Sequence, residues 1–560
     1  MNKTWALWCT FVIAAMALPA HSTEQAGRPN ILVLMAEDMS ARVGAFGDPV
    51  ARTPNIDRLA QQGVRYPNTF TTAGVCAPSR AAHITGMHQI AMGGQHMRTS
   101  TYPDGGYLAV PPAEVKAYPE LLRREGYFTW TDVKLDYQFS GSVFSSGPFT
   151  IWDAQDRDAH FRWRDRQPGQ PFYGLVNFAV THESGIFQPL GNWPNSMSHF
   201  VMQVMRALLA PDAPEMPPTD PETIVLPPYL PDVPAVRADI ARHYDNIAIM
   251  DWEVGQILAG LEADGLAEST IVIWTTDHGD GLPRSKRELY DTGIKVPMVI
   301  RWPEKYRPAG VPAGAVDMRM VSFVDLAPTI LRLAGAELPD YLQGRDLSHS
   351  EPRQYIFASR DRIDEVPDRQ RAVRDRQYKY VRSWYPDLPG GHPLKFRDNL
   401  DMMQAMWSLL EEGKLNEQQR LWFEPSGKER LFDLDVDPWE LNDLAGDPEY
   451  AQVLTRMRGA LETWRNEVGD WSDEPEAQMV ARFQPKGETP VTAAPSVSFA
   501  QQGMVLSSQT EGASLGYSLD EGDSWQLYVD PVAVPSGSVV IAKAVRYGFE
   551  ESEEVEASAP

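Results

Sequence analysis

A single cysteine and two short acidic segments are the residues of this sequence whose types could perform chemistry together. Cys76 opens the segment C-A-P-S-R at residues 76–80. The chain has two cysteines, and the other, Cys9, lies in an N-terminal apolar run that we expect to be removed on export. A thiol without an internal disulfide partner is either an inert buried side chain or a residue kept for its reactivity.

The acidic segments follow two apolar runs that are typical of buried strands. Glu37 and Asp38 follow the run 30–35, and Asp277 and His278 follow the run 270–276. In open α/β sheets, ligands collect at the carboxyl ends of the strands. Two adjacent carboxylates repel each other, so such a pair needs a cation or solvent between its members. Each segment alone could be a solvated turn, whereas the two together fit a metal site.

The pattern around Cys76 resembles the signature of the type I sulfatases, C-x-P-S-R-x-x-x-L/I-T-G. The matching residues are Cys76, Pro78, Ser79, Arg80, Ile84, Thr85 and Gly86. The resemblance implies that Cys76 is oxidised after translation to formylglycine, which reacts as an aldehyde hydrate. It also implies a formylglycine-generating maturation enzyme as a partner. The implied fold is α/β and alkaline-phosphatase-like, with a large mixed sheet between helices.

The same resemblance implies a divalent cation at the two acidic strand ends. The implied metal ligands are Glu37, Asp38, Cys76, Asp277 and His278. Glu37 replaces the usual Asp of the family, and His278 replaces the usual Asn. Oxygen ligands favour Ca²⁺, whereas an imidazole tolerates Mn²⁺ or Zn²⁺, so we expect Ca²⁺ ahead of those two ions.

Catalytic roles are carried over from the family to five positions. These positions are Cys76, Arg80, Lys134, His182 and Lys286. Arg80 would hydrogen-bond the hydrated aldehyde and a metal carboxylate, while Lys134 and Lys286 would neutralise the sulfate oxygens. One hydroxyl of the hydrate would attack sulfur, and His182 or Lys286 would protonate the departing alcohol. The other hydroxyl would then collapse to the aldehyde and eject sulfate.

One position departs from the family in a way that affects this last step. Most sulfatases have Lys-x-His where this chain has Lys134-Leu135-Asp136. Either Asp136 is the base that frees the sulfate, or Asp136 faces the substrate and another group, such as His182, does that work. The sequence leaves both possibilities open.

Segment 87–98 and the motifs around Asp136 and His182 resemble bacterial carbohydrate sulfatases related to glucosamine N-sulfate sulfohydrolases. On this resemblance the sugar-binding candidates are His96, Arg98, Asp136 and Glu183. We therefore expect an exo-acting enzyme on oligosaccharides of a sulfated polysaccharide such as ulvan. The alternatives are action on glucosamine N-sulfate or another sulfate, and a phosphodiesterase or phosphonate monoester hydrolase, which Asp277-His278 favours. An inactive carbohydrate-binding protein is the remaining alternative.

The elements that must position these residues follow from periodicity. Between the two predicted strands, residues 240–261 carry apolar side chains at helical spacing, which predicts an α/β fold with a largely parallel sheet. Residues 496–560 show short alternating strands and resemble the β-sandwich module of chitobiase-like enzymes. The expected organisation is a signal peptide at 1–22, a catalytic domain at 23–345, an α+β subdomain at 346–483, a linker at 484–495 and the β module at 496–560.

The composition limits the classes of binding partner and the cellular location that we expect for this protein. The chain has 51 Lys and Arg against 76 Asp and Glu, a net charge of -25. Such a balance argues against nucleic acid and anionic membranes as partners. Residues 1–22 combine Lys3, a short apolar run and small residues, which is typical of a signal peptide. No later run has the roughly 20 apolar residues that span a bilayer, so we expect a periplasmic or secreted protein.

Overall fold

The structure is a computed structural model, and it describes residues 27–102, 105–132, 134–140, 148–157 and 159–560. The predicted signal peptide at 1–22 lies outside the described residues. Within the described ranges, no helix combines the length and the apolar character needed to cross a membrane.

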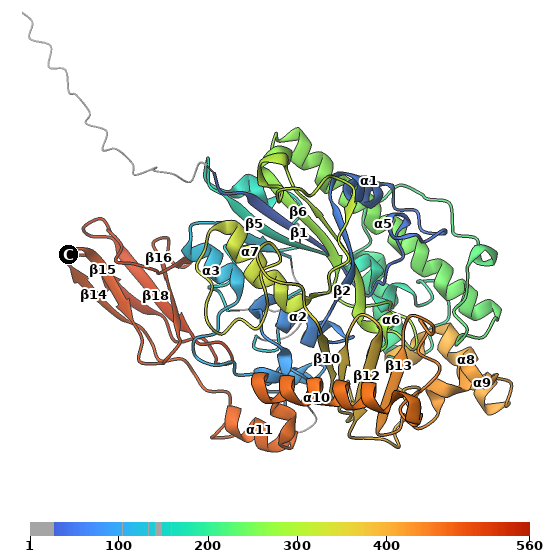
Figure 1. Ribbon diagram of the computed structural model, residues 1–560. Helices are drawn as coiled ribbons and strands as arrows, with labels where there is room; N and C mark the ends of the chain where they lie inside the picture. Colours follow the sequence, from blue (N-terminus) through green and yellow to red (C-terminus); the bar gives the residue numbers. More distant parts are fainter. Residues whose placement is uncertain (1–26, 103–104, 133, 141–147, 158) are drawn as a thin grey trace, which may run out of the picture.

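A large mixed sheet forms the centre of the molecule (Figure 1). Its strands lie in the order β4-β3-β5-β1-β6-β7-β2-β8, with β9 beside β2. Their bounds are β1 Asn30–Ala36, β2 Val64–Phe70, β3 Phe128–Thr131, β4 Ala154–Gln155, β5 Phe172–Phe178, β6 Thr270–Thr276, β7 Lys295–Arg301, β8 Ala315–Val316 and β9 Val321–Ser322.

The sheet is parallel from β4 to β6 and changes direction at β7. β1 pairs in parallel with β5 and β6, whereas β7 is antiparallel to both β6 and β2. The chain between β6 and β7 contains only a short helix, α6, and turns back without crossing the sheet. A parallel connection usually carries a longer crossover helix. The strands at 30–35 and 270–276 were predicted, but the reversal at β7 has no local signal in the sequence.

Helices such as α5 and α7 pack on the two faces of this sheet, and others lie in the smaller sheet region that follows. Their bounds are α1 Pro54–Gln62, α2 Cys76–Thr85, α3 Tyr118–Arg124, α4 Met197–Leu208, α5 Pro234–Ala263, α6 Asp291–Ile294, α7 Leu326–Ala334, α8 Asp401–Glu411, α9 Glu417–Arg420, α10 Ala451–Val468 and α11 Glu476–Phe483. Side chains of β1 alternate between two cores, so that Leu32 and Leu34 pack with α5 while Ile31 and Val33 pack with α7. This period of two is the geometry of a strand buried on both faces.

The helix predicted at 240–261 is confirmed as the central part of α5. The apolar residues that predicted it, from Ile240 to Leu261, lie on its buried face. The helix starts earlier than predicted, at Pro234, because proline is well suited to the first helical turn, where no backbone N–H is needed.

A separate antiparallel sheet follows the central one along the chain. It consists of β10 Ile356–Arg360, β11 Gln370–Arg374, β12 Tyr378–Ser383 and β13 Glu429–Asp433. Helix α10 packs on this sheet through Leu454, Met457 and Leu461, as Figure 1 shows below the central sheet. The smaller α+β region that the sequence predicted is confirmed as part of the fold.

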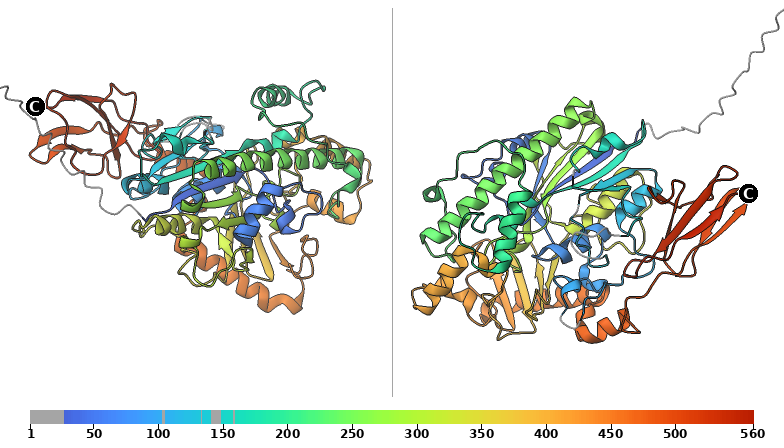
Figure 2. Two further views of the ribbon diagram at one scale, coloured as in Figure 1. Left: turned by 90° about the horizontal axis from the view of Figure 1, so that it is seen from above. Right: turned by 180° about the vertical axis from the view of Figure 1, so that it is seen from behind.

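Two small antiparallel sheets form the C-terminal region, which lies at the periphery of the molecule (Figure 2). One contains β14 Ser496–Ala500 and β15 Gly503–Ser507, and the other contains β16 Ser514–Ser518, β17 Gln526–Leu527, β18 Val539–Val545 and β19 Val555–Ser558. Met504 and Leu506 of the first sheet pack against Tyr517 and Val540 of the second. This is the packing of a small β-sandwich.

Glu120 on α3 joins this C-terminal sandwich to the central sheet region. Its carboxylate accepts hydrogen bonds from Ser514 Oγ at 2.6 Å and from the Tyr547 hydroxyl at 2.7 Å. Burial alone would raise the pKa of Glu120, but Lys116 and Arg124 lower it to about 2. A buried carboxylate with these partners stabilises the junction only while it is ionised.

We predict that this junction weakens in acid. The folded pKa of Glu120, about 2, lies below its ordinary value of 4.5, so its contribution is present above about pH 5 and is lost as the pH falls towards 2. The difference corresponds to roughly 3 kcal/mol. Thermal unfolding at pH 7 and pH 4 should show a smaller pH effect in Glu120→Gln than in the wild type. Glu114→Gln, an exposed carboxylate nearby, is the control; equal pH effects in wild type and Glu120→Gln would contradict the prediction.

Candidate active site

The ends of β1 and β6 bring the two acidic segments together. The parallel register pairs Ala36 with Thr276, so the chain leaves both strands at the same edge of the sheet. The backbone N–H of Asp277 donates to the Ala36 carbonyl at 3.0 Å, and the N–H of Asp38 donates to Asp277 Oδ1 at 3.0 Å. Asp38 adopts a left-handed backbone with φ of 51°, which is uncommon outside glycine and is held here by these contacts.

The amino end of α2 delivers Cys76 to this edge. Cys76 is the first residue of α2, and its Sγ lies 3.2 Å from His278 Nε2 and 3.7 Å from Asp38 Oδ1. Ser79 of the same helix donates to the Asp277 carbonyl at 2.6 Å. The exposed N–H groups and the dipole of a helix amino end favour negative charge, so this position suits an anionic substrate or nucleophile.

Four of the predicted metal ligands form one buried cluster. Asp38, Cys76, Asp277 and His278 each offer a ligand atom, and these atoms lie within 4.8 Å of one another. The remaining ligand, Glu37, belongs to a second group with Asp38 and His182, and its Oε1 is buried without a hydrogen-bond partner. A donor set of carboxylates with one orphaned carboxylate oxygen fits a divalent cation.

The negative groups of the site stabilise the protonated form of His278. Burial lowers the pKa of His278, but Asp277, Cys76 and Asp38 raise it to a net value of about 10. His278 Nε2 lies 3.0 Å from Asp38 Oδ1, while its Nδ1 lies 3.0 Å from the Gly279 carbonyl. A proton on Nε2 therefore supplies there the kind of charge that a metal ion would supply.

Three predicted catalytic cations pair with the metal carboxylates. Arg80 donates from Nε and Nη2 to Asp277 Oδ2 at 3.1 and 2.9 Å. Lys134 Nζ lies 3.1 Å from Glu37 Oε2, and Lys286 Nζ forms an ion pair with Asp38 Oδ2. Burial opposes ionisation of Asp38, but Lys286 and the nearby histidines hold its pKa well below the usual range. Each of these buried charges thus has an opposite charge in contact.

His182 presents a ring N–H to the cluster. The backbone N–H of Ser184 donates to His182 Nδ1 at 3.2 Å, which places the proton of the neutral ring on Nε2. Nε2 lies 3.4 Å from Lys286 Nζ and 3.9 Å from Asp38 Oδ2. Burial and Lys286 keep the pKa of His182 well below its ordinary value, so the ring is neutral at neutral pH. A neutral ring with a proton on Nε2 can donate a hydrogen bond to an oxygen placed in the site.

The predicted sugar-binding residues fall into three different settings. Arg98 Nη2 donates to Asp136 Oδ2 at 3.1 Å, so these two residues form a pair. Glu183 is fully buried, and its backbone N–H donates to Asp38 Oδ2 at 2.6 Å. His96 Nδ1 accepts from the Arg362 N–H at 3.2 Å, and its Nε2 lies 3.6 Å from Glu476 Oε1. No hydrogen bond or ion pair among the described residues joins His96 to the metal cluster.

Sequence reasoning did not identify Arg287, which holds Glu183. Arg287 donates from Nη1 and Nη2 to the two oxygens of Glu183 at 2.8 and 2.9 Å. Both side chains are buried. Its position directly after Lys286, in the loop that follows β6, was the available signal.

Asn177 and Asp132 were also missed, and they orient Arg80. Arg80 Nη1 donates to Asn177 Oδ1, while Asn177 donates from its backbone N–H and Nδ2 to the carboxylate of Asp132 at 2.6 and 2.9 Å. Asp132 directly follows β3, and Asn177 lies near the end of β5. The strand-end rule that identified Asp38 and Asp277 applies to these two residues as well.

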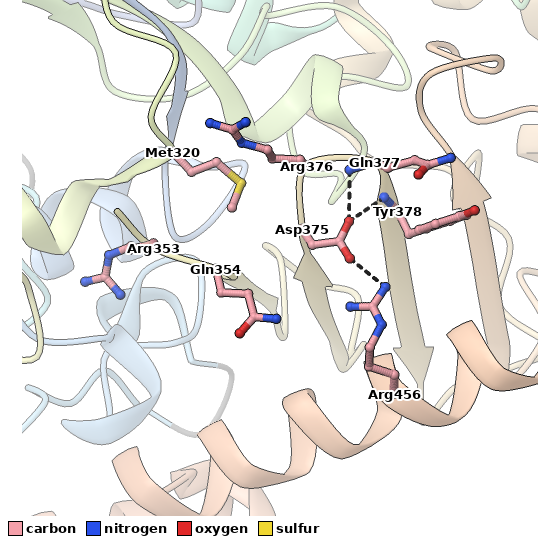
Figure 3. A pocket seen from close by; sticks show the side chains of 8 residues that line it. All are labelled: Met320, Arg353, Gln354, Asp375, Arg376, Gln377, Tyr378 and Arg456. Carbon is pink, nitrogen blue, oxygen red and sulfur yellow. Dashed lines mark hydrogen bonds and ion pairs between the residues drawn. The ribbon is translucent and has the colours of Figure 1, made fainter. Parts of the chain in front are cut away.

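A pocket on the smaller sheet region contains none of the predicted site residues (Figure 3). It is lined by Met320, Arg353, Gln354, Asp375, Arg376, Gln377, Tyr378 and Arg456. Its carboxylate, Asp375, accepts hydrogen bonds from the backbone N–H groups of Gln377 and Tyr378 and pairs with Arg456 at 2.7 Å. Asp375 therefore stabilises the turn between β11 and β12, and the chemistry belongs at the ends of β1 and β6.

We predict that Arg287 supports the cation site through Glu183. Arg287→Met removes both hydrogen bonds to the buried Glu183 carboxylate and leaves only Lys286, at 3.6 Å, to compensate its charge, which costs about 3–5 kcal/mol of unfolding free energy. Because the Glu183 N–H holds Asp38, divalent cation affinity should also fall about 10–100-fold, measured by calorimetric titration. In the double variant Arg287→Met/Glu183→Gln, most of the lost stability should return. A double variant as unstable as the sum of the two single variants would contradict this pairing.

Comparison with known proteins places this site in a family. A family model described as Sulfatase matches residues 29–336. An ulvan-active sulfatase of Formosa agariphila is 39% identical over 562 residues, covering 95% of this chain and 91% of that protein. The N-sulphoglucosamine sulphohydrolase of Homo sapiens is 27% identical over 82% of this chain and 94% of that protein.

A solved structure adds to the evidence on the fold. It is described as a complex with its substrate D-glucosamine-2-N,6-O-disulfate, and it has a TM-score of 0.55 at 17% identity, covering 80% of this chain and 99% of that chain. The alkaline-phosphatase-like fold that the sequence predicted is confirmed. The chain belongs to the sulfatase family, and it is a sulfuric ester hydrolase.

Proposed function

We propose that this enzyme hydrolyses sulfate esters on carbohydrate, acting from the ends of oligosaccharides of a sulfated polysaccharide such as ulvan. The observation that carries the proposal is the similarity to the ulvan-active sulfatase, which extends over nearly the whole chain. The similarity to the N-sulphoglucosamine sulphohydrolase supports a sulfated sugar as well.

Family membership implies formylglycine and a divalent cation, and the residues present fit both. We propose that Glu37, Asp38, Asp277 and His278 hold the cation together with residue 76, and that the ion is Ca²⁺. When bound, the cation would supply positive charge to the sulfate oxygens and favour an ionised nucleophile. Formylglycine at position 76 would supply a hydrated aldehyde as the nucleophile.

The protein's own residues would bind the sulfate group and deliver a proton. Lys134 and Lys286 pair with Glu37 and Asp38 beside the proposed cation position, so their ammonium groups would help the cation to neutralise the sulfate oxygens. The Nε2–H of His182 faces the same space and would carry the proton towards the departing alcohol oxygen. Arg80 keeps Asp277 ionised and fixed. Asp136, already paired with Arg98, would orient that guanidinium towards the substrate.

We further propose that modification of Cys76 precedes folding. Cys76 has 0% of its surface exposed, so a maturation enzyme could not reach its sulfur in the folded protein. Modification of the unfolded segment 76–86 during export fits the predicted signal peptide at 1–22 and a periplasmic or secreted enzyme. We also propose domain boundaries near residues 345, 483 and 495, where the chain passes from one sheet region to the next.

Mass spectrometry of the peptide containing residue 76 tests the nucleophile. We expect loss of the thiol and gain of an aldehyde in enzyme produced with the maturation system, together with sulfate release from ulvan oligosaccharides. Cys76→Ala should retain the unfolding temperature of the unmodified protein and lose at least about 10⁴-fold in kcat/KM. An active Cys76→Ala variant would overturn the assignment. Turnover of a phosphodiester with none of a sulfate ester would instead favour the phosphohydrolase alternative.

The identity of the cation is tested by removing it and adding it back. After treatment with a chelator, Ca²⁺ should restore the unfolding temperature and activity more effectively than Mn²⁺ or Zn²⁺. His278→Asn replaces a nitrogen ligand by an oxygen ligand, so the ratio of Ca²⁺ to Zn²⁺ affinity should rise about tenfold or more. His349→Asn, at an exposed histidine, is the matched control. An unchanged affinity ratio in His278→Asn would show that His278 does not bind the ion.

A further inference from the structure

Two loops from distant parts of the sequence meet beside Cys76. Met97 forms a parallel β-bridge with Ile363, and the Met97 N–H donates to the Arg362 carbonyl at 2.8 Å. Met97 and Ile363 belong to the same apolar cluster as Cys76. The loop after β10 therefore lines the active site beside Cys76.

The residue after each bridge partner has a left-handed backbone. Arg98 has a φ of 60° and Asp364 has a φ of 49°. A non-glycine residue in this region costs of order 1–3 kcal/mol and persists where the surrounding structure holds it. Because the bridge is parallel, the two strained residues leave it in the same direction. One cationic and one anionic residue therefore follow directly after the bridge.

Asp364 lies at the rim of the site. The side chains of Lys286 and Asp38 are 2% and 0% exposed, whereas those of Lys134 and His182 are 13% and 18% exposed. Those of Arg98 and Asp364 are 23% and 25% exposed. With the proposed sulfate position among the deep groups, the rim groups would face the part of the substrate that carries the sulfate.

The Asp364 carboxylate is left with unused hydrogen-bonding capacity. Arg287 Nε lies 3.9 Å from the carboxylate, and both terminal nitrogens of Arg287 are already bound to Glu183. Arg98 is near enough for the charge of Asp364 to help raise the pKa of Arg98. Within the described part of the chain, no hydrogen bond reaches the Asp364 side-chain oxygens, while its backbone carbonyl accepts from Arg362 at 2.9 Å. A carboxylate in this setting can accept hydrogen bonds from a bound ligand.

We propose that Asp364 is a specificity-determining residue that accepts hydrogen bonds from hydroxyl groups of the sulfated sugar. This inference rests on the proposed carbohydrate substrate. A carboxylate repels sulfate and a second anionic group, so it suits neither the reacting group nor another sulfate at this position. Neutral hydroxyl donors are the groups of a sugar that it can bind. Arg98, beside it, remains available for an anionic substituent.

Two substitutions test Asp364 without disturbing its backbone. Asp364→Asn removes the charge and Asp364→Gly removes the side chain, and both residues tolerate a positive φ. We would measure kcat/KM for ulvan oligosaccharides and for 4-nitrophenyl sulfate, which has no sugar hydroxyls. Loss of the charged acceptor should lower the ratio of oligosaccharide to aryl-sulfate kcat/KM by about 10–100-fold, mainly through KM. Asp364→Glu should recover part of the loss.

Glu365→Gln is the matched control, because Glu365 is the next residue, carries the same charge and is exposed. It should leave the ratio unchanged. Equal losses on both substrates in the Asp364 variants would overturn the inference and show that Asp364 acts through Arg287. An unchanged ratio would also overturn it. If the wild type released no sulfate from any carbohydrate while hydrolysing the aryl sulfate, the proposed function itself would fail first.

Discussion

The compensation of buried negative charge at one edge of the sheet is the constraint on which the site depends. Four carboxylates without appreciable exposure meet there, and four cations contact them. The carboxylates are Glu37, Asp38, Glu183 and Asp277, and the cations are Arg80, Lys134, Lys286 and Arg287. Removing such charges from water costs several kcal/mol each, so the loss of any member weakens the compensation of its neighbours. The arrangement still leaves Glu37 Oε1 without a hydrogen bond, which is the place where one more cation fits.

These ion pairs also connect elements that are far apart in sequence. Lys286 joins the loop after β6 to Asp38 after β1, and Arg80 joins α2 to Asp277. Arg287 ties that same loop to the segment after β5 through Glu183. Because each contact requires its partner strands in register, the parallel pairing of β1 with β5 and β6 and the electrostatics of the site stabilise each other. A shift of one residue in β1 would move Asp38 away from Lys286 and Asp277.

The parts of the fold that the sequence predicted are those with a local signal. The strands at 30–35 and 270–276 and the helix at 240–261 are visible as periodicity, and the carboxylates at the strand ends follow from topology. Arg287 and Asp364 could not be predicted in the same way. Arg287 matters because Glu183 is buried beside it, and Asp364 because a single bridge between Met97 and Ile363 brings its loop to Cys76. Such contacts depend on tertiary packing, so the only local signal was the position of Arg287 directly after Lys286.

The buried charged side chains belong to the reactive centre, whereas the partly exposed charged side chains at the rim are placed to determine substrate specificity. The deep groups come from the central sheet and its loops, and their pairing leaves little freedom for change. The rim receives Arg98 from the loop after α2 and Asp364 from the loop after β10, so two separate parts of the chain contribute to it. A change at the rim alters what surrounds the sulfate without unbalancing the buried charges. The same reactive centre can therefore be presented to different sulfated substrates by altering the loops that meet above it.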